Sequence, residues 1–257
     1  MIYVLGDSFS FGWNFFMDSR KDREQLVFGH LLSKKLNMPY KNLSMPAGSN
    51  WRIARLVSML DLTKDDVVVI SWTAPDRYEV PSQPLNFSPL DKVFDINNHK
   101  VEDFKLSMPG EFFQFIERFN NQYTRRVYRG LIDAKYKTNN NIFKNLYNTM
   151  YENFYCPKYY DQMFKVMYSS TLCYLQHSQC KFIMFNGWTN NCQKVTDIFN
   201  IKEYLFGSNH NMTSVIRNKK PTNPPEYYTP LLEYWTEKEH EQVAEIIYKK
   251  LKELYDI

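Results

Sequence analysis

Two patterns of apolar residues alternate along the chain. Short continuous apolar runs, of the kind that strands buried inside a parallel sheet need, predict strands at residues 2–5, 40–44, 66–72 and 181–186. Apolar residues that recur every three or four positions predict helices at residues 22–36, 50–60, 160–176 and 239–255. Strands that alternate with helices favour one parallel sheet joined by right-handed crossovers. We therefore expect a doubly wound, three-layer α/β/α fold with the first strand in a central position.

The alternation breaks down between Pro75 and Pro157. Four prolines up to residue 89 indicate an extended segment, and apolar periodicity then predicts helices at residues 111–119 and 125–134. We interpret residues 75–157 as a helical insertion that caps the carboxyl edge of the sheet, within a single domain of residues 1–257. A proline-rich loop at residues 221–230 is long enough to have a function of its own.

The composition argues against two classes of partner. The net charge of +4 is small for a nucleic-acid-binding protein, and we interpret the basic residues between Arg125 and Lys137 as a solvated helix face. No apolar run is long enough to span a membrane, and Met1 leads into the first strand without the pattern of a signal peptide. We therefore expect a protein made in a cytoplasm, with neither nucleic acid nor membrane as its partner.

The sequence contains no motif for a cofactor or a metal ion. The four cysteines form no Cys-x-x-Cys pair and have no histidine at the spacing of a zinc site. No glycine-rich phosphate loop follows a predicted strand, and the chain has only eight glycines from which to build one. We expect reduced cysteines, no cofactor and no metal ion.

The most informative motif directly follows the first predicted strand. It reads Gly6-Asp7-Ser8-Phe9-Ser10-Phe11-Gly12. A glycine lets the chain turn sharply, and the turn presents a serine hydroxyl at the carboxyl end of the strand, where open α/β sheets bind ligands. The plainer alternative is an Asp-Ser pair that caps a helix. The motif resembles the first block of the SGNH, or GDSL-type, hydrolases. This resemblance implies their flavodoxin-like fold, with Ser8 as the nucleophile of ester hydrolysis.

Two further segments can be compared with the blocks of that family. Gly48 stands where the family has a glycine whose amide binds the oxyanion, and Asn50 beside it is either a binding residue or a helix cap. After the third strand the family has Gly-x-Asn-Asp, but here Pro75 replaces the asparagine. Thr73 and Arg77 remain as candidates, one to donate a hydrogen bond and the other to hold an anionic group of the substrate. This segment is similar to variants in phage-encoded relatives, which suits a viral protein made in a host cytoplasm.

The fourth block of the family departs most from the expected pattern. The register of the last predicted helix places the family's catalytic aspartate and histidine at Leu231 and Tyr234, which cannot take those roles. His240, with Glu237 three residues before it, is one substitute. His210, on a predicted loop, is another.

A structural role for His240 competes with the catalytic one. Thr236 and Glu239 have the spacing of a capping box, which makes Thr236 the residue before the helix. Trp235 and His240 are then expected to pack together as a hydrophobic staple. The imidazole would in that case stabilise the helix rather than activate Ser8.

Two functions follow from these observations. In the first, the chain is an SGNH-like esterase or acyl hydrolase that acts through Ser8 on a small ester or an acetylated carbohydrate. In the second, it is a catalytically degenerate SGNH scaffold that binds a ligand or serves in virion assembly. The choice depends on whether a base reaches Ser8, because a serine hydroxyl needs an adjacent base to become a nucleophile. The sequence does not predict an oligomeric state.

Overall fold

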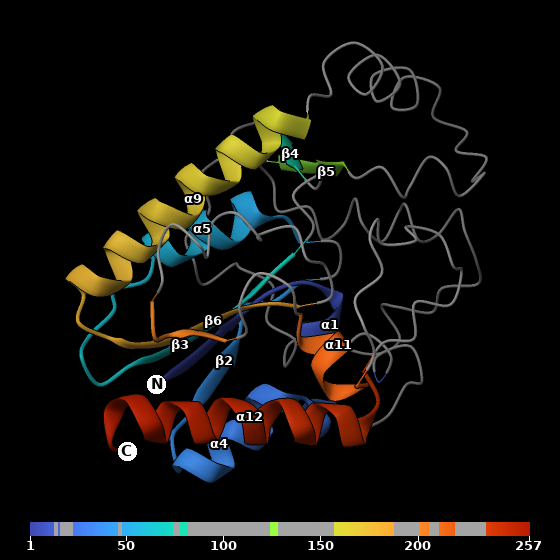
Figure 1. The fold of residues 1–257 in the computed structure, drawn as a ribbon, viewed down its shortest axis with the longest axis vertical. Coiled ribbons are helices and arrows are strands. Elements are labelled where there is room, and N and C mark those ends of the chain that lie inside the picture. The colour runs from blue at the N-terminus through green and yellow to red at the C-terminus, as the bar shows by residue number, and fades with distance from the viewer. Residues whose placement is uncertain are drawn as a thin grey trace.

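The structure is a computed structural model that describes residues 1–12, 15, 23–45, 48–73, 78–81, 124–127, 157–187, 201–205, 211–218 and 235–257. This part of the chain has an α/β fold with a five-stranded parallel sheet (Figure 1). The strand order is β2-β1-β3-β6-β7. The strands are β1 (Ile2–Leu5), β2 (Tyr40–Asn42), β3 (Val67–Trp72), β6 (Lys181–Asn186) and β7 (Tyr204–Leu205).

The position of β1 in the sheet determines where a ligand site is expected. β1 is an internal strand, parallel to β2 on one side and to β3 on the other, although β3 holds the middle position. The chain leaves β1 toward one edge of the sheet and, after β2, crosses to the other side to form β3. This reversal of direction opens a crevice between the carboxyl ends of β1 and β3. Open α/β sheets bind ligands in such a crevice.

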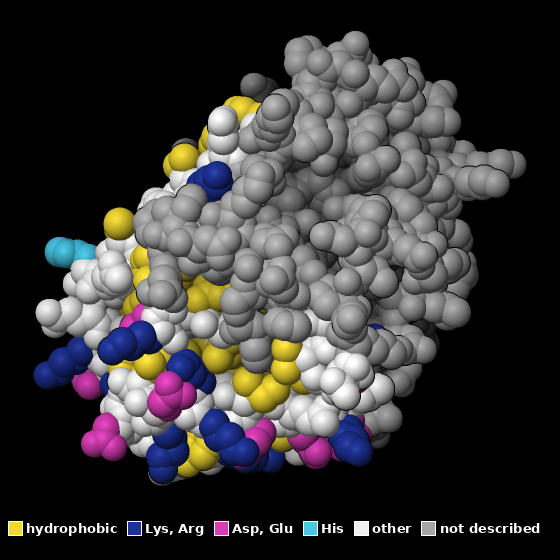
Figure 2. Space-filling model, in the orientation of Figure 1, with side chains coloured by type: hydrophobic (Ala, Val, Ile, Leu, Met, Phe, Trp, Pro, Cys, Tyr) yellow, Lys and Arg dark blue, Asp and Glu magenta, His cyan; other side chains and the backbone are white. Residues whose placement is uncertain are grey.

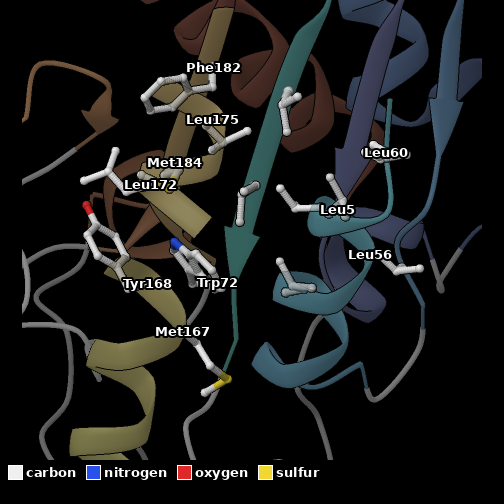
Figure 3. Close-up of a cluster of buried hydrophobic side chains, with 14 of the residues drawn as sticks. Leu5, Leu56, Leu60, Trp72, Met167, Tyr168, Leu172, Leu175, Phe182 and Met184 are labelled. Atoms are coloured by element: carbon white, nitrogen blue, oxygen red, sulfur yellow. The ribbon is translucent and has the colours of Figure 1, made fainter. Parts of the chain in front are cut away.

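Helices cover both faces of the sheet, so the predicted three-layer arrangement is confirmed (Figure 1). α5 (Asn50–Ser58) and α9 (Pro157–His177) pack on one face, and α4 (Phe28–Leu36) and α12 (Glu237–Tyr255) on the other. The side chains of β3 alternate between the two cores. Val68, Ile70 and Trp72 enter the core beneath α5 and α9 (Figure 3), whereas Val67 and Val69 enter the core beneath α4 and α12.

Two helical segments differ from the prediction, and a third matches only its alternative interpretation. The helix expected at residues 22–36 is divided into α3 (Arg23–Leu26) and α4, because Val27 adopts an extended conformation and buries its side chain. Of two short helices, α11 (Met212–Ile216) was not predicted, and α1 (Ser8–Phe11) corresponds to the alternative in which the Asp-Ser pair caps a helix. Both are too short to show a helical period, so local capping residues define them instead.

The insertion contains two described strands, β4 (Tyr78–Pro81) and β5 (Thr124–Val127), which pair antiparallel. The helix predicted to start at Arg125 is therefore wrong for its first three residues. Strand pairing between segments this far apart in sequence has no local signature. The rest of the insertion, including residues 111–119 and any cap over the sheet, lies outside the described residues, as does the loop at 221–230.

The outer face of α12 carries charges of both signs (Figure 2). Glu245 pairs with Lys35 of α4 and with Lys249, and Lys250 pairs with Glu253. Exposed pairs of this kind contribute little to stability. They show a solvated helix face rather than a basic surface. Among the helices that the structure describes, none is both long and apolar enough to cross a membrane.

One ion pair at the start of α12 is better protected from solvent. The Glu239 carboxylate accepts hydrogen bonds from Arg217, which follows α11, and from the backbone of Thr236. Burial alone would raise the pKa of Glu239, but these hydrogen bonds outweigh it and hold the pKa below its usual value. The pair therefore joins α11 to α12, and Thr236 completes the predicted capping box.

We expect Glu239→Gln to lower stability at pH 7 and to have a smaller effect near pH 3.5. Glutamine keeps the capping-box bond, so the substitution removes mainly the charge that faces Arg217. Since the folded-state pKa of Glu239 is lowered, its contribution is complete above the ordinary glutamate pKa and is lost progressively as the pH falls through the lowered pKa. Urea unfolding of both proteins at the two pH values measures the difference. An equal loss at both values would contradict the role of the charge.

Candidate active site

The turn after β1 places Ser8 at the carboxyl end of an internal strand. Asp7 is the N-cap of α1, and its Oδ1 accepts a hydrogen bond of 3.1 Å from the amide of Phe9. Ser8 is the first residue of α1 and is 7% exposed. Asp7 therefore caps a helix, as the alternative interpretation of the motif predicted. Ser8 still lies at the carboxyl edge of the sheet, where the sequence analysis placed it.

Asp7 also joins this turn to the residue that follows β3. Its Oδ2 accepts a hydrogen bond of 2.8 Å from the hydroxyl of Thr73. The carboxamide of Asn50 holds the backbone of Thr73 on both sides: its Oδ1 accepts from the Thr73 amide and its Nδ2 donates to the Thr73 carbonyl, each at 2.9 Å. All three side chains are buried. The loops after β1, β2 and β3 are thus bonded together beside Ser8 through Asp7, Thr73 and Asn50, which we call the Asp7 network.

The network changes the roles expected of Thr73 and Asn50. Thr73 was predicted to donate a hydrogen bond at the site, and Asn50 to be either a binding residue or a helix cap. The capping alternative is wrong for Asn50, because the N-cap of α5 is Ser49. In this structure the Thr73 hydroxyl donates to Asp7, and both polar atoms of Asn50 bond to the Thr73 backbone. The role of Asp7 in linking these loops was not predicted from the sequence, although an aspartate directly before a short helix is a typical capping residue.

Gly48 brings the loop after β2 against the turn that holds Ser8. A Cβ atom on Gly48 would lie 2.9 Å from the carbonyl oxygen of Met45 and 3.0 Å from that of Gly6. Its amide donates a hydrogen bond of 2.9 Å to the Met45 carbonyl. The glycine is required here by a close approach of two backbone segments. To bind an oxyanion as predicted, the Gly48 amide would have to share its hydrogen between the oxyanion and the Met45 carbonyl, or give up its bond to Met45.

We expect Gly48→Ala to destabilise the fold by about 1–3 kcal/mol, the range typical of overpacking in a well-packed interior. The new methyl group meets two backbone carbonyls, which cannot rotate away as a side chain can. Gly187→Ala is the matched control, because its methyl group would meet the Ser71 hydroxyl at 2.6 Å, on a side chain that can change rotamer. Thermal unfolding compares the two. A larger loss for Gly187→Ala would contradict this account of Gly48.

His240 lies in an aromatic cluster on the α4 and α12 side of the sheet. Its ring stacks on Phe28 at 6.1 Å between centroids and meets Trp235 edge-on at 5.6 Å, which confirms the predicted staple. The side chain is fully buried, and Nδ1 accepts a hydrogen bond of 3.2 Å from the Phe28 amide. Burial lowers the pKa of His240 to about 3, so the imidazole is neutral at pH 7 and carries its proton on Nε2.

Among the described residues, His240 forms no hydrogen bond with Ser8 or Glu237. Its Nδ1 accepts from the Phe28 amide, and its Nε2 has no hydrogen-bond partner there. Glu237 is the first residue of α12, one turn before His240. In this conformation the structure therefore does not bring Glu237 and His240 together as a base for Ser8.

Four other residues named in the sequence analysis have no described geometry. Arg77, His210 and the two residues aligned with the family's catalytic pair, Leu231 and Tyr234, lie outside the described residues. The described neighbours of Tyr234 and His210 are informative. The ring of Trp235, directly after Tyr234, lies 5.4 Å from the ring of Phe9 in α1. The residue after His210, Asn211, caps α11, where the amide and hydroxyl of Thr213 both donate to the Gly187 carbonyl at 3.1 Å. The chain therefore reaches the carboxyl end of β6 directly after His210.

Neither metal coordination nor disulfide formation is seen in the described part of the chain. No group of three or more His, Cys, Asp or Glu side chains there could hold a metal ion. The two described cysteines, exposed Cys173 and buried Cys180, are both free thiols. The polar chemistry found near Ser8 is that of hydroxyls, one carboxylate and carboxamides.

The chain was compared with models of known protein families and with curated proteins. No family model matches it, and no curated protein does.

Proposed function

We propose that the chain is an SGNH-like serine hydrolase that uses Ser8 to cleave a small carboxylic ester or an acetyl group on a carbohydrate. The observation that carries the proposal is the placement of Ser8. It begins α1 at the carboxyl end of β1, beside β3, and the Asp7 network holds its turn against the neighbouring loops. Ligand sites of open α/β sheets lie at such a reversal of strand order.

The reaction would follow the two steps of a serine hydrolase. The Ser8 oxygen attacks the ester carbonyl, its proton passes to a base, and the alcohol leaves with that proton; water then releases the acid from the acyl-enzyme. The developing oxyanion would be held by the amide of Ser8 and, after a change in the Met45–Gly48 turn, by that of Gly48.

His210 is the base that we propose. His240 is buried, neutral and bonded to Phe28, whereas the chain next to His210 is fixed at the carboxyl end of β6. A base must come within about 3 Å of the hydroxyl from which it takes a proton. His210 precedes the cap of α11 directly, so the chain passes the edge of the sheet where Ser8 lies.

Fluorophosphonate labelling tests the nucleophile. We expect weak labelling of the wild type, none of Ser8→Ala, and cleavage of short-chain p-nitrophenyl esters by the wild type alone. Ser10→Ala is the matched control. Ser10 lies two residues away in α1 and is fully buried, and its hydroxyl has no hydrogen-bond partner among the described residues. This variant should label as the wild type does.

Two results would count against this function. Equal labelling of wild type and Ser8→Ala would place the reactive group elsewhere. An absence of labelling in folded wild type would favour the degenerate scaffold. His210→Ala separates the proposed base from the nucleophile, since it should slow labelling and ester cleavage while leaving the Ser8 turn intact.

A further inference from the structure

Four residues on the other side of the sheet from the α4 and α12 core are linked in a ring by strand pairing, two aromatic contacts and one hydrogen bond. Trp72 ends β3 and Asn186 ends β6, and the two residues are partners in the parallel register. The Trp72 ring lies 6.0 Å from that of Tyr168 on α9, and Tyr168 lies 5.9 Å from Tyr204 on β7. The Tyr204 hydroxyl donates a hydrogen bond of 2.8 Å to Oδ1 of Asn186, which completes the ring. We call these four residues the β3–β6 ring.

Two nitrogen donors on this ring have no hydrogen-bond acceptor among the residues that the structure describes. They are the indole Nε1 of Trp72 and the carboxamide Nδ2 of Asn186, and both are inaccessible to solvent. Both residues are at least 99% buried. Trp72 and Tyr168 lie side by side, with the indole nitrogen turned toward Tyr168 (Figure 3). Leaving a buried donor unpaired destabilises a fold, so two on adjacent strands require an explanation.

The chemistry of the two donors specifies what would satisfy them. An indole nitrogen can only donate a hydrogen bond. The Asn186 carboxamide uses one polar atom for Tyr204, and in either orientation of the amide its other polar atom stays unpaired. An oxygen atom that accepts from Trp72 and can also exchange a hydrogen bond with Asn186 meets both requirements. Water and an alcohol hydroxyl have this property in both orientations, and a carboxylate has it in only one.

We propose that the β3–β6 ring binds a single oxygen atom, which bridges Trp72 Nε1 and Asn186 Nδ2. The oxygen belongs either to an internal water molecule or to a hydroxyl group of a small ligand. The site does not involve Ser8, because the side chains of Trp72 and Asn186 project from the face of the sheet that packs on α5 and α9. Buried water typically makes about three hydrogen bonds to polar groups that the protein leaves unpaired. The ring supplies two such groups.

The indole proton of Trp72 reports on the site directly. In protein labelled with ¹⁵N-tryptophan, the Trp72 signal is assigned by its loss in Trp72→Phe. We expect a downfield, hydrogen-bonded indole proton with a cross-peak to a long-lived water molecule, and an upfield shift with loss of that cross-peak in Asn186→Leu. The signal of Trp51, a half-buried residue of α5, is the control and should not change.

Titration distinguishes the two sources of the oxygen. With internal water, the cross-peak persists and the Trp72 signal does not respond to glucose or to sodium acetate. With a ligand hydroxyl, glucose shifts the Trp72 signal in a saturable way and removes the cross-peak. An upfield indole proton in the wild type, without a cross-peak and without a response to either compound, would overturn the proposal. The wild-type measurement suffices if Asn186→Leu does not fold, and none of these results depends on the reactivity of Ser8.

Discussion

His240→Phe is expected to make the fold less sensitive to acid than the wild type. Burial lowers the pKa of His240 to about 3 in the folded protein, whereas in the unfolded chain it returns to about 6.5. Between these values the unfolded chain binds a proton that the folded protein does not. The stability that His240 contributes is therefore complete above pH 6.5 and is lost as the pH falls toward 3. Each unit of the shift corresponds to roughly 1.4 kcal/mol, so the whole effect amounts to several kcal/mol.

The surroundings of His240 determine how the substitution acts at neutral pH. Phenylalanine keeps the ring contacts with Phe28, Phe15 and Trp235. It leaves the Phe28 amide without an acceptor, at a cost of about 1–3 kcal/mol, and the loss of the unpaired Nε2 donor offsets part of this cost. The charge of Glu239 favours the protonated imidazole and is retained in the variant. The variant should be less stable than the wild type at pH 7 and should approach or pass it near pH 4.5.

Urea unfolding at pH 7, 6, 5 and 4.5 provides the measurement. His240→Ala is the comparison, since it also removes the titrating group but loses the ring contacts and leaves a cavity. It should be the least stable of the three proteins at pH 7, by about 3–5 kcal/mol relative to wild type, as for other large buried rings. Parallel pH profiles for wild type and His240→Phe would show that His240 does not titrate in the manner its burial requires.

The four longer strands of the sheet were predictable because their signals are local. The run from Val67 to Ile70 is apolar and β-branched throughout, and such a run fits a central parallel strand better than any other element. β7 has only two residues, and β4 acquires its pairing from β5, a partner distant in sequence. Neither has a period that can be recognised in the sequence. Their existence depends on tertiary contacts.

The same difference between local signals and long-range contacts applies to the candidate site. Ser8 could be located from one short motif, and the staple of Trp235 and His240 from a capping box, because the residues concerned are close in sequence. The Asp7 network joins residues separated by 66 and 23 positions. Nothing in the local pattern around Thr73 indicates that its hydroxyl bonds to Asp7. The polar residues after each strand were recognised as candidates, but their partners were not.

Asp7→Ala is expected to lower stability and to abolish the reactivity of Ser8 together. The substitution leaves the Phe9 amide and the Thr73 hydroxyl without their acceptor, and each buried group left unpaired costs about 1–3 kcal/mol. It also frees the turn that carries Ser8. Asp7→Asn is the conservative control, because its carboxamide can still accept from Phe9 and can donate to the Thr73 hydroxyl. It should keep most of the stability and part of the labelling.

A double-mutant cycle with Thr73→Val shows whether Asp7 and Thr73 act as one unit. Thr73→Val removes the hydroxyl that donates to Asp7 while keeping the shape of the side chain. If the bond holds the Ser8 turn in place, Thr73→Val should cost clearly less in the Asp7→Ala background than in the wild type. Labelling by a fluorophosphonate, measured per folded molecule, should fall to the same level in both single variants and the double variant. Additive losses in stability, or full labelling of folded Thr73→Val, would mean that the bond between Asp7 and Thr73 does not position Ser8.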